Sequence, residues 1–325
     1  MKILIIRLSS LGDIVLTQPI VANFRRLFPK AEIDYLTKPI FKPIVEAFGD
    51  IDQIFFWSKH EKLRLINNLA SRKYDLVVDL HSKLNTTLIK YLIFPSKIVT
   101  YQKKHFLRWL ITKKLTSKTI DSTLDLYSSV FDKMNLEFIK NNPILSSQKI
   151  TREFPKNLKV ITIFPGATHQ TKRFPDHKYI DLIKKISCKI ECKIILLGSK
   201  QESELSEKIH QATLKISENK CGNFDLTELI AFLTGIDLMI SNDSGPMHIA
   251  AALNKKQIAI FGSTSTKLGF KPLNDKAIVF QKNLKCQPCT LHGRKKCPKS
   301  HFDCMNSLDI EKIAEKIYSL LIKGQ

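Results

Sequence analysis

The chain has no long apolar run. None of its segments approaches the roughly 20 consecutive apolar residues that a membrane-spanning helix needs. The N-terminal sequence MKILIIRLSSLGD holds an apolar run of only four residues, which is too short for the core of a signal peptide. We therefore expect a cytosolic protein whose contact with a membrane is at most peripheral.

Two phosphate-binding motifs are also missing. The sequence contains neither G-x-G-x-x-G nor G-x-x-x-x-G-K-[ST], so a dinucleotide-binding site or a P-loop loses its main support. Acidic residues are few, because 30 Asp and Glu oppose 52 Lys and Arg, which gives a net charge of +22. Such a charge attracts nucleic acid, an anionic membrane or a phosphorylated substrate, although a Lys-rich solvated surface gives the same count.

The length favours two domains. A chain of 325 residues exceeds what one hydrophobic core usually serves, and two units of about 150 residues fit better. The stretch 140–157 is polar, carries two prolines and shows little periodicity, so we predict a linker there. We expect a first domain at residues 1–150 and a second at 151–325.

Short β-rich runs alternate with amphipathic segments of helical length throughout the chain, a pattern typical of parallel α/β sheets. The predicted strands are 2–7, 32–37, 53–57, 76–80 and 97–101, then 160–164, 193–197, 238–240 and 257–261. The predicted helices are 13–28, 40–48, 61–72 and 83–94, then 176–189, 201–213, 226–234, 245–253 and 309–322. The fold class is therefore α/β, with two Rossmann-like domains facing a cleft.

Three predicted loops follow strands and could carry chemistry. The first contains Ser9, Ser10, Gly12 and Asp13, where Gly12 permits close backbone approach and the serines offer hydroxyls. Asp13 lies where a helix begins, so it is equally well explained as a catalytic carboxylate and as a helix cap.

The second loop, FPGATHQTKRFP at 164–175, combines small residues with Thr168, Lys172 and Arg173. Exposed backbone N–H groups followed by a hydroxyl and two cations suit a diphosphate, although basic surface loops are common.

The third loop, SNDSGPMHIAAA at 241–252, leads into a helix with Ser244 as its cap and Gly245 at its start. Such a helix N-terminus can bind a pyrophosphate, while Asp243 receives sugar or ribose hydroxyls. His248 is either part of this site or a core or capping histidine.

Three segments together, IRLSSLGDIVLTQP, FPGATHQTKRFP and SNDSGPMHIAAAL followed by AIFGST, resemble glycosyltransferase family 9, the bacterial lipopolysaccharide heptosyltransferases. The resemblance covers both halves in the right order. It implies a GT-B fold with an N-terminal acceptor domain, a C-terminal donor domain and a last helix that packs back toward the first domain. It also implies inversion of the anomeric centre in one displacement, with no metal and no cofactor.

The resemblance assigns roles to individual residues. Asp13 is the general base on the acceptor hydroxyl, and Lys172 neutralises the departing diphosphate. The other donor-binding residues that it implies are Thr168, Glu228, Asp243, Ser244, Gly245 and His248. Glu228 or a neighbour would hold the nucleotide ribose, and the adenine preference is inherited from the family. On the acceptor side we expect Ser9, Ser10 and Gly12.

The function that the resemblance implies is transfer of heptose from ADP-heptose to the Kdo or heptose of a lipid A core. We expect it at the cytoplasmic face of the inner membrane, whose anionic surface is a further partner. One alternative keeps the fold and changes the nucleotide sugar. Another, motivated by the charge alone, is a nucleic-acid-binding protein, but no nucleic-acid module is recognisable and we expect no such partner.

A basic segment at 103–118 mixes apolar residues with six Lys or Arg. We expect Lys103, Lys104 and Arg108 to bind an acidic acceptor or a membrane interface as part of the first domain. The alternative is a helix packed on that domain with its cations reaching into solvent.

Four cysteines fall late in the chain. They are Cys286, Cys289, Cys297 and Cys304, interleaved with His292 and His301. C-x-x-C with two more thiols could hold zinc or an iron–sulfur cluster, but a second C-x-x-C is missing. We expect thiols that order a loop beside the donor site, without a metal.

Overall fold

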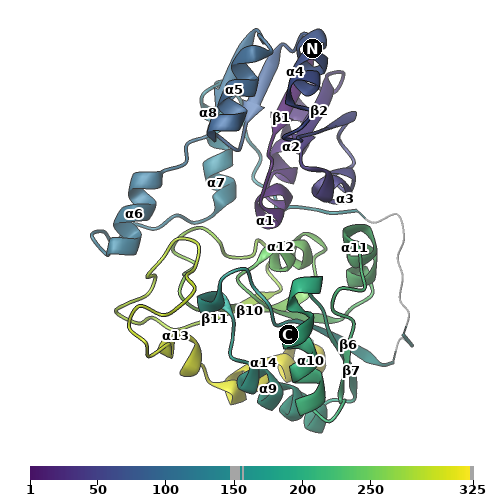
Figure 1. Ribbon diagram of the computed structural model, residues 1–325, viewed down its shortest axis with the longest axis vertical. Coiled ribbons are helices and arrows are strands. Elements are labelled where there is room, and N and C mark those ends of the chain that lie inside the picture. The colour runs from purple at the N-terminus through teal and green to yellow at the C-terminus, as the bar shows by residue number, and fades with distance from the viewer. Residues whose placement is uncertain (147–153, 156, 323–325) are drawn as a thin grey trace. The chain divides into compact units, whose positions relative to one another are not determined.

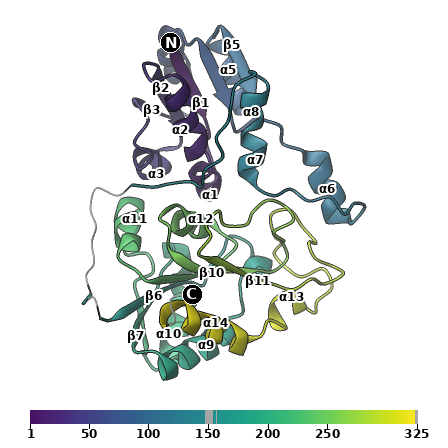
Figure 2. The same cartoon turned by 180° about the vertical axis from the view of Figure 1, so that it is seen from behind.

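The computed structural model describes residues 1–146, 154, 155 and 157–322, and divides the chain into two compact units (Figures 1 and 2). The first unit is Met1–Lys104 with Ser122–Ser146, and the second is His105–Asp121 with Ser147–Gln325. Each carries one parallel sheet with helices around it. The predicted α/β class with two Rossmann-like units is confirmed.

The sheet of the first unit has the order β3-β2-β1-β4-β5 and is parallel throughout. Its strands are β1 Lys2–Ile6, β2 Glu32–Thr37, β3 Gln53–Phe56, β4 Leu76–Asp79 and β5 Lys97–Thr100. The central strand is a continuous apolar run, as a parallel strand covered on both faces requires. All five strands lie within one residue of their predicted bounds.

Helices pack on both faces of this sheet. Its helical segments are α1 Leu11–Val15, α2 Gln18–Leu27, η1 Pro39–Phe41, α3 Lys42–Glu46, α4 Lys62–Ser71, α5 Leu84–Leu92, α7 Thr123–Tyr127 and α8 Ser129–Asp132. One face of the sheet packs its Leu4, Ile6 and Val77 against apolar residues of α4 and α5. The predicted helix 13–28 is two helices, because Pro19 lies in the first turn of α2 and lacks the N–H that would continue α1.

The sheet of the second unit has the order β11-β10-β9-β6-β7-β8 and is also parallel. Its strands are β6 Lys159–Phe164, β7 Cys192–Leu196, β8 Ser217–Asn219, β9 Leu238–Asn242, β10 Lys256–Phe261 and β11 Ala277–Gln281. The sequence analysis missed β8 and β11. Both are edge strands. β8 is the short polar run SEN, which has no apolar pattern and is recognised as a strand only by its pairing with a neighbouring strand.

The helical segments of the second unit are α6 His105–Lys113, η2 Gln170–Lys172, α9 Asp176–Lys189, η3 Lys200–Glu202, α10 Ser203–Ala212, α11 Leu226–Thr234, α12 Gly245–Ala252, α13 Asp303–Asn306 and α14 Ile310–Ile322. One face of the sheet packs against α9, α10 and α14, and Met247 of α12 packs against Ala259 and Phe261 of β10. Within the described residues, no helix combines the length and the apolarity needed to cross a bilayer.

The last helix packs within the second unit. Its apolar side chains Ile313, Ile317 and Leu320 are buried in the core of that unit, where α14 lies against α9. Its packing toward the first domain, which the resemblance implied, stays a prediction. The amphipathic pattern correctly predicted which residues of α14 are buried, but it did not predict the helix that they pack against.

The basic segment corrects one expectation, because most of it packs in the second unit and not in the first. The backbone N–H of Ile120 donates to the Lys267 carbonyl at 2.9 Å. Arg108 donates to the Leu268 carbonyl at 3.3 Å, and its guanidinium lies 5.1 Å from the ring centroid of Phe270. Only the start of the segment, with Lys103 and Lys104, stays in the first unit.

The predicted boundary at 150 lies outside the described residues, as does much of the predicted linker. The first unit extends at least to Ser146, whose N–H donates to the Ala47 carbonyl at 2.9 Å.

Candidate functional site

Each sheet has one switch point, where the chain leaves a strand to opposite sides. In the first unit it lies between β1 and β4, and in the second between β6 and β9. Open α/β sheets bind ligands at this point, beyond the carboxyl ends of the strands. The three predicted loops follow β1, β6 and β9, so all three end at a switch point.

Asp13 lies at the switch point of the first unit, in the first turn of α1. Its Oδ2 accepts hydrogen bonds from the Ser10 hydroxyl at 2.7 Å and from the Ser10 backbone N–H at 3.2 Å. The same oxygen forms an ion pair with Arg7 at 2.7 Å. Asp13 therefore has the helix-capping role that the sequence suggested, and it also forms an ion pair with the buried cation Arg7.

Arg7 was missed by the sequence analysis because it ends a predicted strand. Its side chain is buried, donates to the Leu80 carbonyl at 2.5 Å and lies 5.5 Å from the ring centroid of Tyr127. Burial raises the pKa of Tyr127 well above its usual value, so this phenol stays neutral and donates to Asp13 Oδ1 at 3.4 Å. Arg7 and Tyr127 hold the carboxylate of Asp13 from two sides.

The other loop residues predicted on the acceptor side lie around this carboxylate. Ser10 is the N-cap residue of α1 and is exposed, Gly12 is buried in the same turn, and Ser9 is half-buried. Their contact with an acceptor stays a prediction.

The loop after β4 was not singled out from the sequence, yet it lies beside the loop after β1, because Asp79 pairs with Ile6. The fully buried carboxylate of Asp79 accepts the backbone N–H groups of His81 at 2.9 Å and Ser82 at 2.7 Å. Its other oxygen accepts Lys90 at 3.1 Å. Asp79 thus holds His81 at the switch point.

His81 stands among cations. Burial, followed by the charges of Arg7 and Lys83, lowers its pKa from 6.5 to about 4. Its buried Nδ1 has no hydrogen-bond partner among the described residues. The ring is therefore neutral at physiological pH, and the positive charge around it comes from Arg7, Lys83 and Lys103.

Of the three cations predicted for the acceptor, Lys103 lies in this group. Its ammonium donates to the Ser82 carbonyl, and burial lowers its pKa. Lys104 is exposed at the end of the first unit. Arg108 is buried against Phe270 in the second unit, so it does not join Lys103 within one unit.

Asn242, the last residue of β9, organises the switch point of the second unit. Its fully buried amide nitrogen donates to the carbonyls of Pro165 at 2.9 Å and Gly166 at 3.1 Å. Its oxygen accepts the Phe174 N–H at 2.9 Å. One side chain therefore fixes both ends of the loop after β6. The sequence analysis assigned it no role.

Lys172 and Asp243 come together across this switch point. The ammonium of Lys172 lies 2.7 Å from Asp243 Oδ2, which also accepts the Thr264 hydroxyl at 2.7 Å. Both side chains are largely buried. The structure therefore brings together two predicted donor-site residues and adds Thr264, which the sequence analysis missed.

The N-terminus of α12 follows Asp243 directly. Ser244 is its N-cap residue and is half-buried, but its side chain makes no capping hydrogen bond and instead donates to the Asn242 carbonyl at 3.3 Å. Gly245 begins the helix and His248 is buried in its first turns. The first backbone N–H groups of a helix have no partner within it, so this end favours an anion.

Thr168 and Glu228 receive less support. Thr168 is exposed in the loop after β6. Glu228 forms a capping box at α11, in which its carboxylate accepts the Asp225 N–H at 2.8 Å and its own N–H donates to the Asp225 carboxylate at 2.8 Å. The structure shows Glu228 as a helix cap, and its contact with a ribose stays a prediction.

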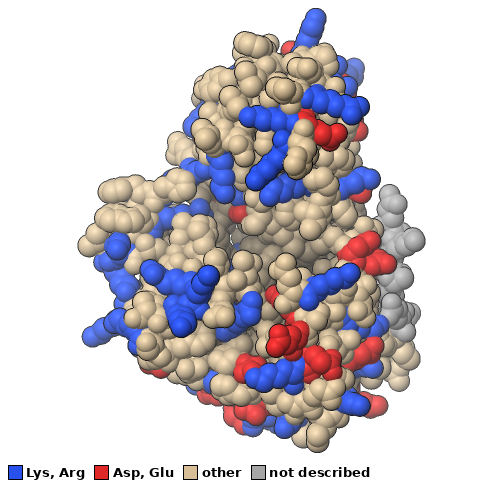
Figure 3. Space-filling view, viewed as in Figure 1, with Lys and Arg blue, Asp and Glu red and all other residues tan. Residues whose placement is uncertain are grey.

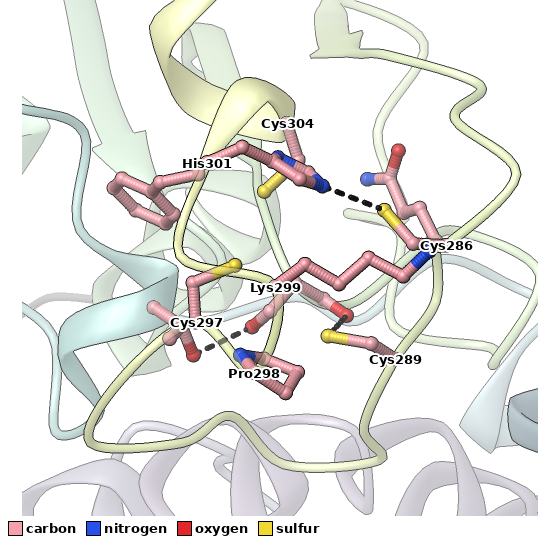
Figure 4. A pocket seen from close by; sticks show the side chains of 11 residues that line it. Cys286, Cys289, Cys297, Pro298, Lys299, His301 and Cys304 are labelled. Carbon is pink, nitrogen blue, oxygen red and sulfur yellow. Dashed lines mark hydrogen bonds between the residues drawn. The ribbon is translucent and has the colours of Figure 1, made fainter.

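The late cysteines line one small cavity (Figure 4). It measures about 20 Å³, room for roughly one water molecule, and Cys286, Cys289, Cys297 and Cys304 all border it. Cys286 Sγ lies 3.8 Å from Nε2 of His301, and Cys289 donates to the Ser263 carbonyl at 3.7 Å. Burial raises the pKa of Cys304 to about 12. Within the part of the chain that the structure describes, no three His, Cys, Asp or Glu are grouped as a metal site.

This loop does border the predicted donor site. Thr171, next to Lys172, hydrogen-bonds Ser263 at 2.9 Å and accepts the Arg294 N–H at 2.8 Å. The sequence analysis expected the thiols to order a loop beside that site, and these bonds connect the two segments.

Comparison with known proteins identifies the family of the chain. The sequence model of glycosyltransferase family 9 (heptosyltransferase) matches residues 62–300. Lipopolysaccharide heptosyltransferase 1 of Campylobacter coli is 27% identical, over 98% of this chain and 99% of that protein.

Two solved structures share the fold. ADP-heptose lps heptosyltransferase II of E. coli matches with a TM-score of 0.79 at 20% identity, over 100% of this chain and 99% of that one. E. coli heptosyltransferase WaaC with ADP-2-deoxy-2-fluoro heptose matches with a TM-score of 0.73 at 16% identity, over 98% and 100%.

Replacing Asn242 by Ala should destabilise the second unit. The substitution leaves the buried carbonyls of Pro165 and Gly166 and the N–H of Phe174 without their partner. We expect a loss of about 2 to 4 kcal/mol in the free energy of unfolding, measured by urea denaturation. Asn223→Ala, at an exposed position of the same unit, is the control and should cost under about 0.5 kcal/mol. Equal losses in the two variants would contradict the role of Asn242.

His81 predicts a pH dependence of stability. Because its pKa is about 4 in the folded chain and 6.5 when unfolded, the unfolded state binds an extra proton between these values. Its contribution is therefore complete above pH 6.5 and is lost as the pH falls toward 4, by up to about 3 kcal/mol. His81→Gln should flatten unfolding free energy against pH over this window, whereas His60→Gln, at an exposed position, should not. A wild-type slope that survives in His81→Gln would refute the assignment.

The cysteine cavity should contain no metal. We expect elemental analysis of protein purified without added metal to find zinc and iron far below one equivalent per chain. Near-stoichiometric zinc or iron, lost in Cys286→Ser, would overturn this expectation.

Proposed function

Because this chain belongs to glycosyltransferase family 9, we propose that this glycosyltransferase moves heptose from ADP-heptose to the Kdo or heptose inner core of lipid A, with inversion. Two proteins of the same fold carry ADP-heptose or an ADP-linked fluoro heptose in their names, which supports this donor. The arrangement of each unit supports the chemistry.

The observation that carries the proposal is the pair of switch points. One holds a carboxylate fixed by a buried cation, Asp13 with Arg7. The other holds the ammonium of Lys172 near the N-terminus of an eight-residue helix, α12. A glycosyl transfer without covalent catalysis needs these two elements: an acceptor for the nucleophile's proton, and positive charge for the leaving group.

On the acceptor side we assign the proton to Asp13. A sugar hydroxyl is a poor nucleophile, and a carboxylate within hydrogen-bond reach contributes about 10²- to 10⁴-fold. Oδ2 already accepts Arg7 and Ser10, whereas Oδ1 has the longer contact with Tyr127, so we assign the acceptor hydroxyl to Oδ1. As the hydroxyl oxygen bonds to the anomeric carbon, its proton passes to Asp13.

The bond from the anomeric carbon to the diphosphate breaks in the same displacement, and its electron pair leaves with ADP. Lys172 and the first N–H groups of α12 face the charge that develops on the diphosphate. This fixed positive charge supplies what a divalent metal supplies in other transferases, so we propose a metal-independent reaction. Asp243 positions Lys172 and, with Ser244, Gly245 and His248, lines the donor site.

The surroundings of His81 suit an acidic acceptor. Kdo carries a carboxylate, and the inner core of lipid A is anionic. Arg7, Lys83 and Lys103 all contribute positive charge at His81, next to the loop that holds Asp13. We propose that Lys103 and Lys83 bind the acceptor's carboxylate or phosphate, a role that the sequence analysis gave to Lys103, Lys104 and Arg108 together.

We propose that the protein works at the cytoplasmic face of the inner membrane, where a lipid-anchored acceptor is accessible to a peripheral enzyme. The net charge of +22 supports attraction to an anionic leaflet. Exposed Phe106 and Trp109 of α6, stacked at 5.8 Å between ring centroids, are a further apolar element of the kind found at membrane interfaces.

The direct test is a panel of sugar nucleotides and truncated lipid A cores, followed by nucleotide release and by the mass added to the acceptor. We expect ADP release from ADP-heptose and the mass of one heptose on the core. Activity with a different nucleotide sugar alone would keep the reaction class and overturn the donor.

Asp13→Asn and Lys172→Ala should fail in different ways. Asp13→Asn keeps the size and much of the capping ability but removes the proton acceptor, so turnover should fall at least about 10²-fold with donor affinity nearly intact. Lys172→Ala should weaken donor affinity and turnover together, because the diphosphate is charged before and during departure. Steady-state kinetics and donor titration measure both.

Exposed residues of the same types provide the controls. Asp132→Asn in the first unit and Lys184→Ala in the second should leave turnover and donor affinity unchanged. Wild-type turnover in Asp13→Asn would contradict the general-base role and leave helix capping as the role of Asp13.

A further inference from the structure

Helix α5 exposes apolar side chains that the core of the first unit does not use. Leu84 is 85% exposed and Phe94, just after the helix, is 84% exposed. Leu88, Tyr91 and Leu92 are exposed as well. We call these five residues the α5 face. Their spacing of four, seven and eight residues from Leu84 puts Leu88, Tyr91 and Leu92 on one side of the helix.

The opposite side of α5 is already occupied. Ile89 and Ile93 pack into the core with residues of α4 and the sheet, and Lys90 is buried on Asp79. A helix with apolar residues on both sides normally lies between two partners. The described part of the first unit supplies only one of them.

Phe94 extends the α5 face beyond the end of the helix. It lies just beyond the end of α5 with φ of 46°, in the left-handed region where Gly or Asn is preferred after a helix. A bulky side chain is strained there, and this one is almost fully exposed, so it gives the fold no compensating burial.

Every charged residue in the stretch 82–97 is basic. No Asp or Glu occurs there, whereas Lys83 and Lys97 are exposed. Helix α4, which contacts α5, adds exposed Leu63 and exposed Arg64, whose guanidinium lies 3.8 Å from the carboxylate of Glu61. In Figure 3 the surface over α5 is mainly uncharged, and the charged side chains beside it are mostly Lys and Arg.

We propose that the α5 face docks the first unit onto an anionic lipid bilayer, with its apolar side chains in the headgroup region and Lys97 and Arg64 on acidic lipids. An apolar patch with a basic rim fits such a surface. A second copy of the chain fits it less well, because two such faces would bring cations of the same sign together. The inference deepens the proposed function, on which it rests for the lipid-anchored acceptor, although vesicle binding itself requires no sugar transfer.

Vesicle co-sedimentation of the full chain tests the proposal. The variant is Leu84→Gln with Phe94→Asn, which removes two exposed apolar side chains and relieves the strained position. The control is Ile40→Gln with Leu214→Asn. Ile40 is 69% exposed, and Leu214 is 83% exposed with φ of 51°, so it matches Phe94 in both exposure and backbone conformation.

We expect wild type and control to bind vesicles of phosphatidylcholine with phosphatidylglycerol, and to bind pure phosphatidylcholine much more weakly. The α5 variant should lose affinity for the anionic vesicles by about tenfold or more, with an unchanged melting temperature. Its transfer to a water-soluble truncated core should match wild type, whereas transfer to vesicle-bound acceptor should fall.

Three results would overturn the proposal. The first is a wild type that does not bind anionic vesicles, and the second is an α5 variant that binds them as well as the control does. The third is a wild-type dimer in light scattering that the α5 variant alone dissociates, which would give the face to a second copy. Vesicle binding by a chain that transfers no sugar would leave this inference standing and refute the proposed function instead.

Discussion

The second unit depends on one buried amide. Asn242 satisfies two carbonyls at the start of the loop after β6 and one N–H at its end, so the loop cannot move independently of β9. Lys172 lies within that loop and Asp243 is the residue after Asn242. The 2.7 Å distance between their charged groups is therefore set by a neighbouring hydrogen-bond network as well as by their own attraction.

In the first unit, a buried carboxylate fixes a loop in the way that the Asn242 amide does in the second unit. Asp79, fully buried at the end of β4, fixes the loop that carries His81 by accepting two of its backbone N–H groups, and Lys90 neutralises the carboxylate. In both units the last residue of a strand at the switch point has a buried polar side chain that shapes a loop. The loop that Asn242 fixes carries Lys172, and the loop that Asp79 fixes lies beside the loop that carries Asp13, so rigidity is concentrated where orientation matters.

Much of this architecture could be predicted from the sequence. Apolar runs identified nine of the eleven strands found in the described residues, because buried parallel strands are apolar over most of their length. The loops with Asp13, Lys172 and Asp243 were identified as well, since they follow strands. Arg7, His81 and Asn242 were missed, because each lies at a strand end where a single polar residue has no pattern around it. Their importance comes from a neighbouring strand that is remote in sequence.

The prediction that α6 belongs to the first unit was wrong for a related reason. Periodicity reports which side of a helix is buried and says nothing of what buries it, and Arg108 packs on Phe270, far along the chain. The same limit applied to α14, whose buried residues were predicted and whose partner was not.

In the proposed donor site, the ammonium of Lys172 is already paired with the carboxylate of Asp243. A diphosphate that binds there must share the ammonium with this carboxylate, which also accepts the Thr264 hydroxyl. In the proposed reaction, Lys172 keeps Asp243 as its partner when the diphosphate leaves, so product release exposes no unpaired buried charge. Because Asp243 competes for Lys172, it lowers the affinity for the substrate diphosphate and for the product diphosphate. In the proposed reaction a charged product leaves in every cycle, so this competition favours rapid product release.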